Sequence, residues 1–270
     1  MDTPNPSSEH EHEHFLLTTD TTTGVALLRF DRPAKRNAFS QSMITTLCSL
    51  LADLDRSPSV RVVILTGSPD GPFCAGMDIS ELSLLTPASA HARHFLRDLT
   101  DALARFSKPL IAAVVGFALG GGFEIALACD IILASTTATF ALPEVKIGTI
   151  PGAGGTQRLV RALGKHRAMH LVLTGSSLTG IELFEAGAAS EALPAHEVLD
   201  AAMELAGRIG RMSGPVVRAG KQAVLTAETS HLAEGMAAER MLYYSTFGLE
   251  DFKEGQKAFL EKRGAVFKHL

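Results

Sequence analysis

The sequence predicts a mixed α/β body followed by a region made only of helices. Apolar runs rich in Val, Ile and Leu recur along the first two thirds, and glycine-containing loops and helical patterns alternate with them. After Glu197 the apolar residues recur with helical spacing alone. A chain of 270 residues with 46% hydrophobic content can hold one large domain with an extension. We therefore expect a core over 15–195 and a helical region over 196–270.

Composition excludes several classes of protein. The net charge of −4 provides no general attraction for nucleic acid. Cys48, Cys74 and Cys129 lack C-x-x-C spacing, which argues against a disulfide framework or a zinc cluster and for a reducing compartment. Glycines interrupt the apolar runs before they are long enough to span a bilayer. We expect a soluble intracellular protein, whether mitochondrial, peroxisomal or cytoplasmic.

The two ends of the chain carry little targeting information. Residues 1–14 are polar, acidic and without periodicity, which predicts a disordered leader rather than a signal or transit peptide. His10, His12 and His14 alternate with glutamates there, and a solvated leader is a simpler interpretation than a metal site. The final KHL is only loosely similar to the peroxisomal SKL address.

In the first half of the chain, VALLRF (25–30) predicts a strand. Ser40 follows Pro33 and can cap a helix whose apolar positions recur at helical spacing as far as Leu54. The β-branched run VRVVILTG (60–67) predicts a fully buried strand, followed by a turn-rich loop and a short helix. A longer helix is expected over about 88–106.

The second half repeats strand, glycine loop and helix. LIAAVVG predicts a buried strand before the glycine stretch 116–130, and DIILAS a further strand after it. PGAGGTQRLVRALG places another glycine loop before a helix, and a further helix is expected over 166–173. Thr179 and Glu182 form a capping box. The expected helices of the C-terminal region are 197–211, 214–227, 235–247 and 250–262.

The stretch GFALGGGFEIALACD is the first candidate site. Gly120 to Gly122 leave backbone N–H groups uncovered at the start of a helix, where negative charge is favoured. Glu124 lies in the first turn of that otherwise apolar helix. An acid beside bare N–H groups is a plausible catalytic arrangement. The alternative is a closely packed glycine turn in which Glu124 only complements the helix dipole.

Glu144, in ALPEVKIG, is the second acid of interest. It follows Pro143 in a loop leaving an expected strand, and burial among apolar neighbours would disfavour its ionisation. Two carboxyl groups around one pocket can divide acid and base roles, whereas the alternative is a surface loop acid. The sequence lacks a P-loop ending and a G-x-S-x-G elbow, and His91 and His94 fit an exposed helix better than a catalytic site.

Four motifs follow one another along the chain: FDRPAKRNAFS, PFCAGMDI, IAAVVGFALGGGFEIALACDI and PEVKIGTIPGAGGTQRL. Four linked motifs in this order are far more specific than a single glycine triplet. Together they resemble the crotonase superfamily, particularly its enoyl-CoA hydratases, from about Val25 to the C-terminal FLEKR. The resemblance implies a crotonase-like α/β spiral of β-β-α turns with a C-terminal all-helical trimerisation region. Trimers of this family commonly pair into hexamers, so a homo-oligomer is expected.

The resemblance also implies roles for particular residues. The backbone N–H groups of Met77 and Gly121 would form an oxyanion hole for the thioester oxygen. Glu124 and Glu144 match the two catalytic glutamates, and Gly152 matches a backbone position near the catalytic water. Met77 stands where a small residue is usual, and we expect it to narrow the acyl pocket while leaving the N–H donor in place.

Coenzyme A would be bound as part of the substrate, with no metal and no separate cofactor. Phe259 and Lys262 match positions that reach the nucleotide end of CoA on a neighbouring subunit. Gly71 and Ser80 stand where some hydratases have lysines. CoA binding would therefore depend more on Lys35, Arg36 and Lys262. The other matching positions are Ala34, Lys35, Arg36, Ala38, Ala75, Asp78, Ile79 and Ser80.

The implied reaction is hydration of a 2-enoyl-CoA thioester to 3-hydroxyacyl-CoA. Enoyl-CoA isomerisation and 3-methylglutaconyl-CoA hydration are the nearest alternatives, and the presence of both acids favours hydration because isomerases often keep only the second. An RNA-binding relative with the same fold is a rival from another class, against which the acidic charge balance argues.

Overall fold

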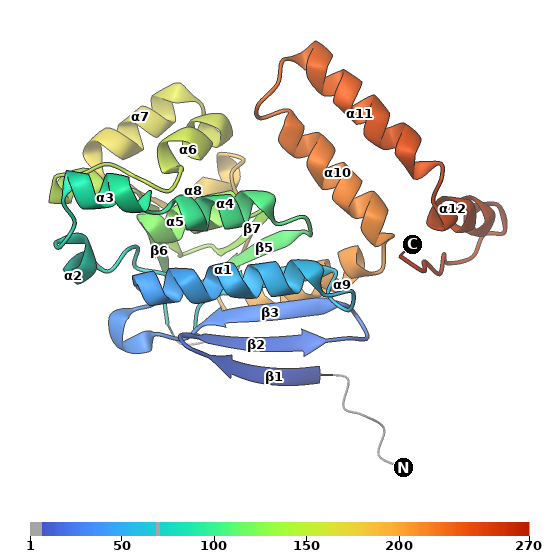
Figure 1. Ribbon diagram of the computed structural model, residues 1–270, viewed down its shortest axis with the longest axis horizontal. Coiled ribbons are helices and arrows are strands. Elements are labelled where there is room, and N and C mark those ends of the chain that lie inside the picture. The colour runs from blue at the N-terminus through green and yellow to red at the C-terminus, as the bar shows by residue number, and fades with distance from the viewer. Residues whose placement is uncertain (1–6, 69–70, 270) are drawn as a thin grey trace.

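The computed structural model describes residues 7–68 and 71–269, and its main element is a seven-stranded sheet (Figure 1). The strand order is β1-β2-β3-β4-β5-β7-β10. The first three strands pair antiparallel, and the pairs from β3 to β10 are parallel. The strands are β1 (Ser7–His12), β2 (Phe15–Asp20), β3 (Val25–Phe30), β4 (Val62–Thr66), β5 (Leu110–Val114), β7 (Ile131–Ser135) and β10 (Glu191–Leu193).

Helices cover both faces of this sheet, which explains why its central strands are apolar throughout. In β4, Val63 and Leu65 belong to the core beneath α1 (Gln41–Arg56), α4 (Arg97–Arg105) and α5 (Gly121–Ala128). The alternate residues Val62 and Ile64 pack on the opposite face, against α9 (Val198–Gly210). Side chains of a strand alternate between faces, so two covered faces require a continuous apolar run.

A second, three-stranded sheet in the order β6-β8-β9 supports the glycine loops. Two isolated bridges tie the loops to it and to each other: Cys74 pairs with Ala118, and Phe39 pairs with Met77. The FDRPAKRNAFS, PFCAGMDI and GFALGGG segments therefore lie side by side. The strands of this sheet are β6 (Phe117–Leu119), β8 (Thr139–Ala141) and β9 (Ser177–Thr179).

The remaining elements are helical, and the predicted caps are confirmed. The Ser40 hydroxyl accepts a hydrogen bond from the Met43 amide (3.3 Å), and Thr179 and Glu182 cap α8 reciprocally. The helices not yet bounded are α2 (Ile79–Leu82), α3 (Pro87–Arg93), α6 (Gly155–Leu163), α7 (Lys165–Thr174), α8 (Gly180–Glu185), α10 (Gly214–Thr226), α11 (Leu232–Thr246) and α12 (Glu250–Leu260), with 3₁₀ turns η1 (Pro33–Lys35) and η2 (Glu144–Ile147).

The prediction of a disordered leader over 1–14 is wrong for the part of it that the structure describes. Ser7–His12 forms β1, which pairs along its whole length with β2, while residues 1–6 lie outside the described residues. An edge strand that is polar on both faces has no hydrophobic alternation to reveal it. Its stabilisation comes from the backbone groups that β2 would otherwise leave unpaired.

Two further differences concern helices. The single helix expected over 88–106 is broken into α3 and α4, because His94 and Leu96 both adopt left-handed backbone angles (φ +48° and +68°). The region expected to be a separate helical extension from residue 196 begins with α9, which instead packs on the main sheet. The projecting part therefore starts at α10.

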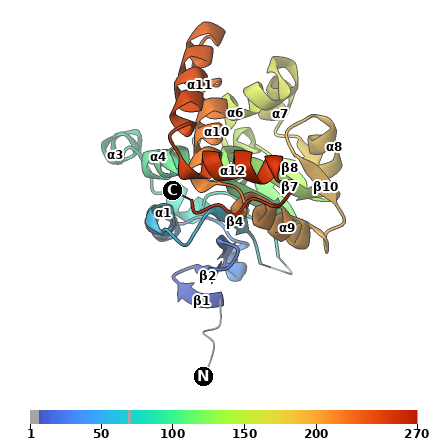
Figure 2. The same ribbon diagram turned by 90° about the vertical axis from the view of Figure 1, so that its right-hand side faces the viewer.

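The C-terminal helices α10 and α11 pack on each other and project from the body, as Figure 1 and the turned view in Figure 2 show. Neither helix has a buried residue in the single chain. The four helices expected in this region are all present, with ends shifted by up to three residues. Within the described residues, no helix combines the length and apolar character needed to cross a membrane.

Candidate functional site

The glycine turn before α5 requires glycine at two positions, for two different reasons. Gly120 has φ +50° and ψ −124°, a conformation that side chains other than hydrogen rarely permit. At Gly122 an added Cβ would lie 2.6 Å from the Cys74 carbonyl oxygen, so only glycine allows this close approach. The turn delivers the chain from β6 into α5 with the N-terminal amides of that helix free of intrahelical partners.

Glu124 is the acid of the first turn of α5, and it is only 2% exposed. Its Oε1 accepts hydrogen bonds from the amides of Ala153 (2.8 Å) and Gly155 (2.7 Å) in the loop before α6. Burial raises the pKa of Glu124, and the amide hydrogen bonds act in the opposite direction. The carboxyl is thus buried but held by groups that favour its ionised form.

Glu144 begins η2, directly after Pro143, and is half-buried. Its Oε2 is buried and has no hydrogen-bond partner among the described residues. Burial, with a smaller contribution from the negative charge of Glu124, raises the pKa of Glu144 to about 7. A carboxyl group in this state is partly protonated at neutral pH and can donate a proton.

Glycines line the space beside both acids. An added Cβ on Gly120 would lie 3.0 Å from Glu144 Oε1, and one on Gly155 would lie 3.0 Å from Glu124 Oε1. Each carboxyl therefore lies directly against a glycine backbone, and the two charges are close enough to influence each other. The structure brings the two sequence-predicted acids together.

Met77 and Gly121 present their amides in the same region. The Phe39–Met77 bridge uses the Gly76 carbonyl and the Asp78 amide, which bond to Phe39 at 2.8 Å each. The Met77 N–H is therefore directed away from Phe39. An added Cβ on Gly76 would lie 3.5 Å from the Gly121 nitrogen, which places these two segments in contact.

The Met77 side chain lies against Gly121. A Cβ on Gly121 would collide with the Met77 methyl group and lie 3.6 Å from its sulfur. This bulk covers one side of the helix start, as a narrowed pocket would require. Gly152 is exposed, and its backbone contributes to lowering the pKa of Glu124, so it lies near that acid; its place beside a catalytic water stays a prediction.

The residues expected to bind CoA through the first loop gather around η1. Ala34, Lys35 and Arg36 are exposed, and the Ala75 amide donates to the Arg36 carbonyl (3.1 Å), which joins the two predicted segments. Ala38, Ile79 and Ser80 flank them along the chain, at the end of this loop and the start of α2.

Asp78 has a structural task within this group. Its carboxylate pairs with Arg32 (2.9 Å) and accepts from the Ser80 amide and hydroxyl (3.1 and 2.5 Å). These bonds, led by the one from the Ser80 side chain, lower the pKa of Asp78. The side chain thus caps α2 and fixes the loop instead of facing solvent, and its backbone remains the part that a ligand could meet.

Arg32 and Asn37 are site-building residues that sequence reasoning missed. Asn37 is fully buried in a left-handed conformation (φ +56°). Its amide group donates to the Pro72 carbonyl (2.9 Å) and accepts from the Arg32 amide (2.9 Å), which clamps the two loops together. The available signal was an asparagine in the turn-forming run DRPAKRN, since asparagine tolerates this conformation well.

Phe259 and Lys262 are not brought near these residues within one chain. They lie in and just after α12, on the opposite side of the molecule from η1 and α2 (Figure 1). Phe259 is 83% exposed. Their assignment to a CoA molecule on a neighbouring subunit stays a prediction.

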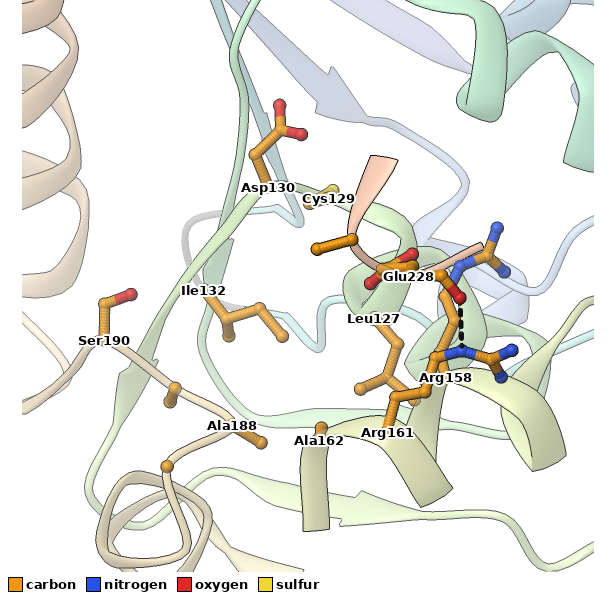
Figure 3. A pocket seen from close by; sticks show the side chains of 13 residues that line it. Leu127, Cys129, Asp130, Ile132, Arg158, Arg161, Ala162, Ala188, Ser190 and Glu228 are labelled. Carbon is orange, nitrogen blue, oxygen red and sulfur yellow. Dashed lines mark hydrogen bonds between the residues drawn. The ribbon is translucent and has the colours of Figure 1, made fainter. Parts of the chain in front are cut away.

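Two surface pockets of about 500 and 530 Å³ border α10, and neither is lined by Glu124 or Glu144. The first is lined by Arg158 and Arg161 of α6 and by Glu228, which follows the C-terminal end of α10 (Figure 3). Within the described residues, no three His, Cys, Asp or Glu side chains are grouped as metal ligands.

Comparison with known proteins assigns this chain to a family. Residues 20–269 match the family described as enoyl-CoA hydratase/isomerase. A probable mitochondrial enoyl-CoA hydratase of Dictyostelium discoideum is 44% identical over 91% of this chain and 88% of its own, and the mitochondrial enoyl-CoA hydratase of Pongo abelii is 43% identical over 90% and 83%.

A solved structure named enoyl-CoA hydratase subunit I, from Geobacillus kaustophilus, has the same fold. It superposes with a TM-score of 0.89 at 37% identity and covers 98% of this chain and 99% of its own. The crotonase-like arrangement that the motifs implied is therefore confirmed. The chain belongs to the enoyl-CoA hydratase/isomerase family, within the crotonase superfamily.

Proposed function

We propose that this chain is a hydro-lyase that adds water across the double bond of a 2-enoyl-CoA thioester. The observation that carries the proposal is the pair of carboxyl groups of Glu124, which is buried and held by amides, and Glu144, which is half-buried and has one buried oxygen without a hydrogen-bond partner among the described residues. The family relatives are named as enoyl-CoA hydratases, which supports the same reaction. The proposed product is a 3-hydroxyacyl-CoA.

The two glutamates have different environments and therefore different proposed roles. Glu124, held by two amides that favour its anion, takes a proton from the attacking water, whose oxygen bonds to Cβ. Glu144, whose pKa is near 7, donates the proton that bonds to Cα. Transfer of the proton from Glu124 to Glu144 restores both groups, so the sum is addition of one water.

The amides of Met77 and Gly121 are the proposed oxyanion hole. Negative charge develops on the thioester oxygen as water adds, and backbone N–H groups fixed before the reaction stabilise it without reorganisation. In comparable enzymes one such donor contributes about 3–4 kcal/mol to the transition state. The start of α5 supplies a favourable dipole at the same place.

CoA binding is proposed to use the exposed loop around η1, with Lys35 and Arg36 as the cations for its phosphates. No metal or redox group takes part in the proposed steps. Phe259 and Lys262 would reach the nucleotide end of CoA held by a second copy of the chain. This requires a homo-oligomer, for which we propose either a trimer or a hexamer made of two trimers.

A panel of short, long and branched 2-enoyl-CoA thioesters tests the function. Loss of the conjugated thioester absorbance, together with a product heavier by one water, is expected for at least one of them. No hydration of any thioester, with turnover of a 3-enoyl-CoA, would instead identify an isomerase. Inactivity towards all of them with salt-sensitive RNA binding would identify a binding protein.

A further inference from the structure

Arg158 holds the loop that holds Glu124. It lies in the first turns of α6, and its side chain reaches back towards the start of that helix. Its Nη1 donates a hydrogen bond of 2.9 Å to the Ala153 carbonyl oxygen. The peptide groups on either side of Ala153 thus have two functions: one binds Arg158 and the other binds Glu124.

The loop formed by Ala153, Gly154 and Gly155 packs closely against the guanidinium group of Arg158. Gly154, at φ +102°, lies so near Arg158 that an added Cβ would overlap Nη1. The amides of Ala153 and Gly155, on either side of Gly154, both donate to the same oxygen of Glu124. A shift of the Ala153–Gly154 peptide would therefore move both donors relative to the carboxylate.

We propose that Arg158 is a positioning residue for the hydration reaction, because it keeps the Ala153–Gly155 loop in the conformation that maintains Glu124 as a carboxylate. This inference rests on the proposed function, in which Glu124 acts as a base. Arg158 itself does not touch the substrate in this scheme. It acts through the two amides and through its positive charge.

The charges around Glu124 are consistent with that role. The positive charge of Arg158 lowers the pKa of Glu124, against the larger effect of burial, while the negative charge of Glu124 raises the pKa of Glu144. On its outer side Arg158 lines the pocket of Figure 3 with Cys129, Asp130, Arg161 and Glu228. The guanidinium thus stays partly solvated, so its charge is retained at a modest desolvation cost.

Arg161 provides a matched control on the same helix. It lines the same pocket, but its donors go to the Gln157 carbonyl (2.9 Å) and, across the pocket, to the Glu228 carbonyl (3.4 Å; Figure 3). It has no hydrogen bond to the loop before α6 among those of the described residues. Loss of a positive charge from this pocket can therefore be separated from loss of the loop contact.

The first experiment compares the pH dependence of kcat/KM for Arg158→Met, Arg158→Lys and Arg161→Met with the unmodified protein. Without Arg158 the protonated form of Glu124 is favoured, so the acidic limb should move upward by about one pH unit. At a pH below both midpoints this gives a loss of about tenfold, and the difference from the unmodified protein disappears as pH rises past them. Arg158→Lys should restore most of the shift, and Arg161→Met should follow the unmodified profile.

A purely structural role predicts another result. If Arg158→Met lowers activity equally at every pH, or if Arg161→Met shifts the acidic limb by the same amount, the proposal is wrong. Thermal unfolding and sedimentation of each variant show whether it keeps the native fold and assembly. Because Arg158→Lys retains the charge, its profile remains informative if the methionine variant does not fold.

A second measurement does not depend on turnover. Carbon-13 labelling of glutamate side chains allows the Glu124 carboxyl to be titrated by NMR, with Glu124→Gln used to assign its signal. The midpoint should be higher in Arg158→Met than in the unmodified protein. If the unmodified protein hydrates no enoyl-CoA, the proposed function fails while this test still applies; equal midpoints would refute the role of Arg158 alone.

Discussion

The helix that carries Glu124 and the helices at the end of the chain differ sharply in their surroundings. The first six residues of α5 are all buried, between the glycine turn and the main core. The longer helices α10 and α11 contain no buried residue. The acid pair is thus assembled by a single chain, with Glu124 in its core, whereas α10 and α11 lack a core of their own.

The projecting helices carry apolar side chains that the single chain leaves exposed. Five of them gather along α11 and the residue after it, and the ring centroids of Tyr243 and Phe247 are 4.7 Å apart. Exposed apolar surface of this extent is uncommon in a monomer. The exposed residues are Met236, Met241, Tyr243, Tyr244 and Phe247. We therefore expect catalysis and assembly to depend on different parts of the chain.

The largest expected effect comes from neutralising the acids. Glu124→Gln and Glu144→Gln should each slow hydration by about 10²–10⁴-fold, because each removes one partner of general acid–base catalysis. CoA affinity should change little, since neither side chain is among the proposed CoA contacts. Initial rates with a 2-enoyl-CoA measure the loss of hydration, and titration of each variant with CoA measures its affinity.

The same pair of variants separates hydration from isomerisation. With a 3-enoyl-CoA substrate, an isomerase would tolerate Glu124→Gln and lose activity with Glu144→Gln, because one group can move the proton. Normal hydration by a folded Glu144→Gln protein would refute the assigned mechanism. Unchanged oligomer size serves as the control for folding.

The next largest effect is expected from the proposed oxyanion donor. Gly121→Pro removes the N–H that would face the thioester oxygen, and turnover should fall by roughly 10²–10³-fold or more. Because Met77 lies against Gly121, the test is best made in a Met77→Ala background. There Gly121→Ala keeps the amide and provides the matched control. Equal activity of folded proline and alanine variants would eliminate Gly121 as a donor.

A smaller effect is expected from pH. Glu144, with a pKa near 7, loses its proton as pH rises, so hydration should decline above pH 7 by about tenfold per unit. A raised pKa means that the folded state binds this proton more tightly than the unfolded state. The contribution of Glu144 to the free energy of unfolding is therefore complete below about pH 4.5 and is lost as the pH rises to about 7. A flat rate profile between pH 6 and 9 would contradict the role of Glu144 as proton donor.

The smallest effect on chemistry should come from the C-terminal helices. Removal of residues from Leu249 onward should weaken assembly and reduce CoA affinity by several-fold, since Phe259 and Lys262 are lost together. Analytical ultracentrifugation and CoA titration measure the two effects, and Phe259→Ala with Lys262→Ala provides a milder version. A stable monomer of the full chain at micromolar concentration, or normal CoA binding after truncation, would show that no neighbouring subunit takes part.

Local signals along the chain were sufficient for most of its elements. The apolar run at 25–30 matches β3 at both ends, and Ser40 caps α1 as its position predicted. The strand-free pattern after Glu197 matches four helices closely. Apolar periodicity and caps report on contacts between near neighbours, so they can be read without knowledge of the fold.

Elements whose stability comes from distant partners were missed. β1 has no apolar face and depends on pairing with β2, and the break between α3 and α4 depends on left-handed angles at His94 and Leu96. The packing of α9 on the main sheet was also not predicted. An apolar helix pattern shows that one face is buried, but the strands that bury it are chosen by the topology.

The residues of the acid pair were identified from their motifs, but their chemical states required the folded chain. Glu124 and Glu144 are twenty positions apart, and no local pattern states that one accepts two amides while an oxygen of the other has no partner among the described residues. The pKa of a carboxyl group depends on burial and on neighbours brought from elsewhere in the sequence. For the same reason Arg158, five residues beyond the carbonyl that it binds, gained its proposed role only when the loop around Gly154 was seen folded against Glu124.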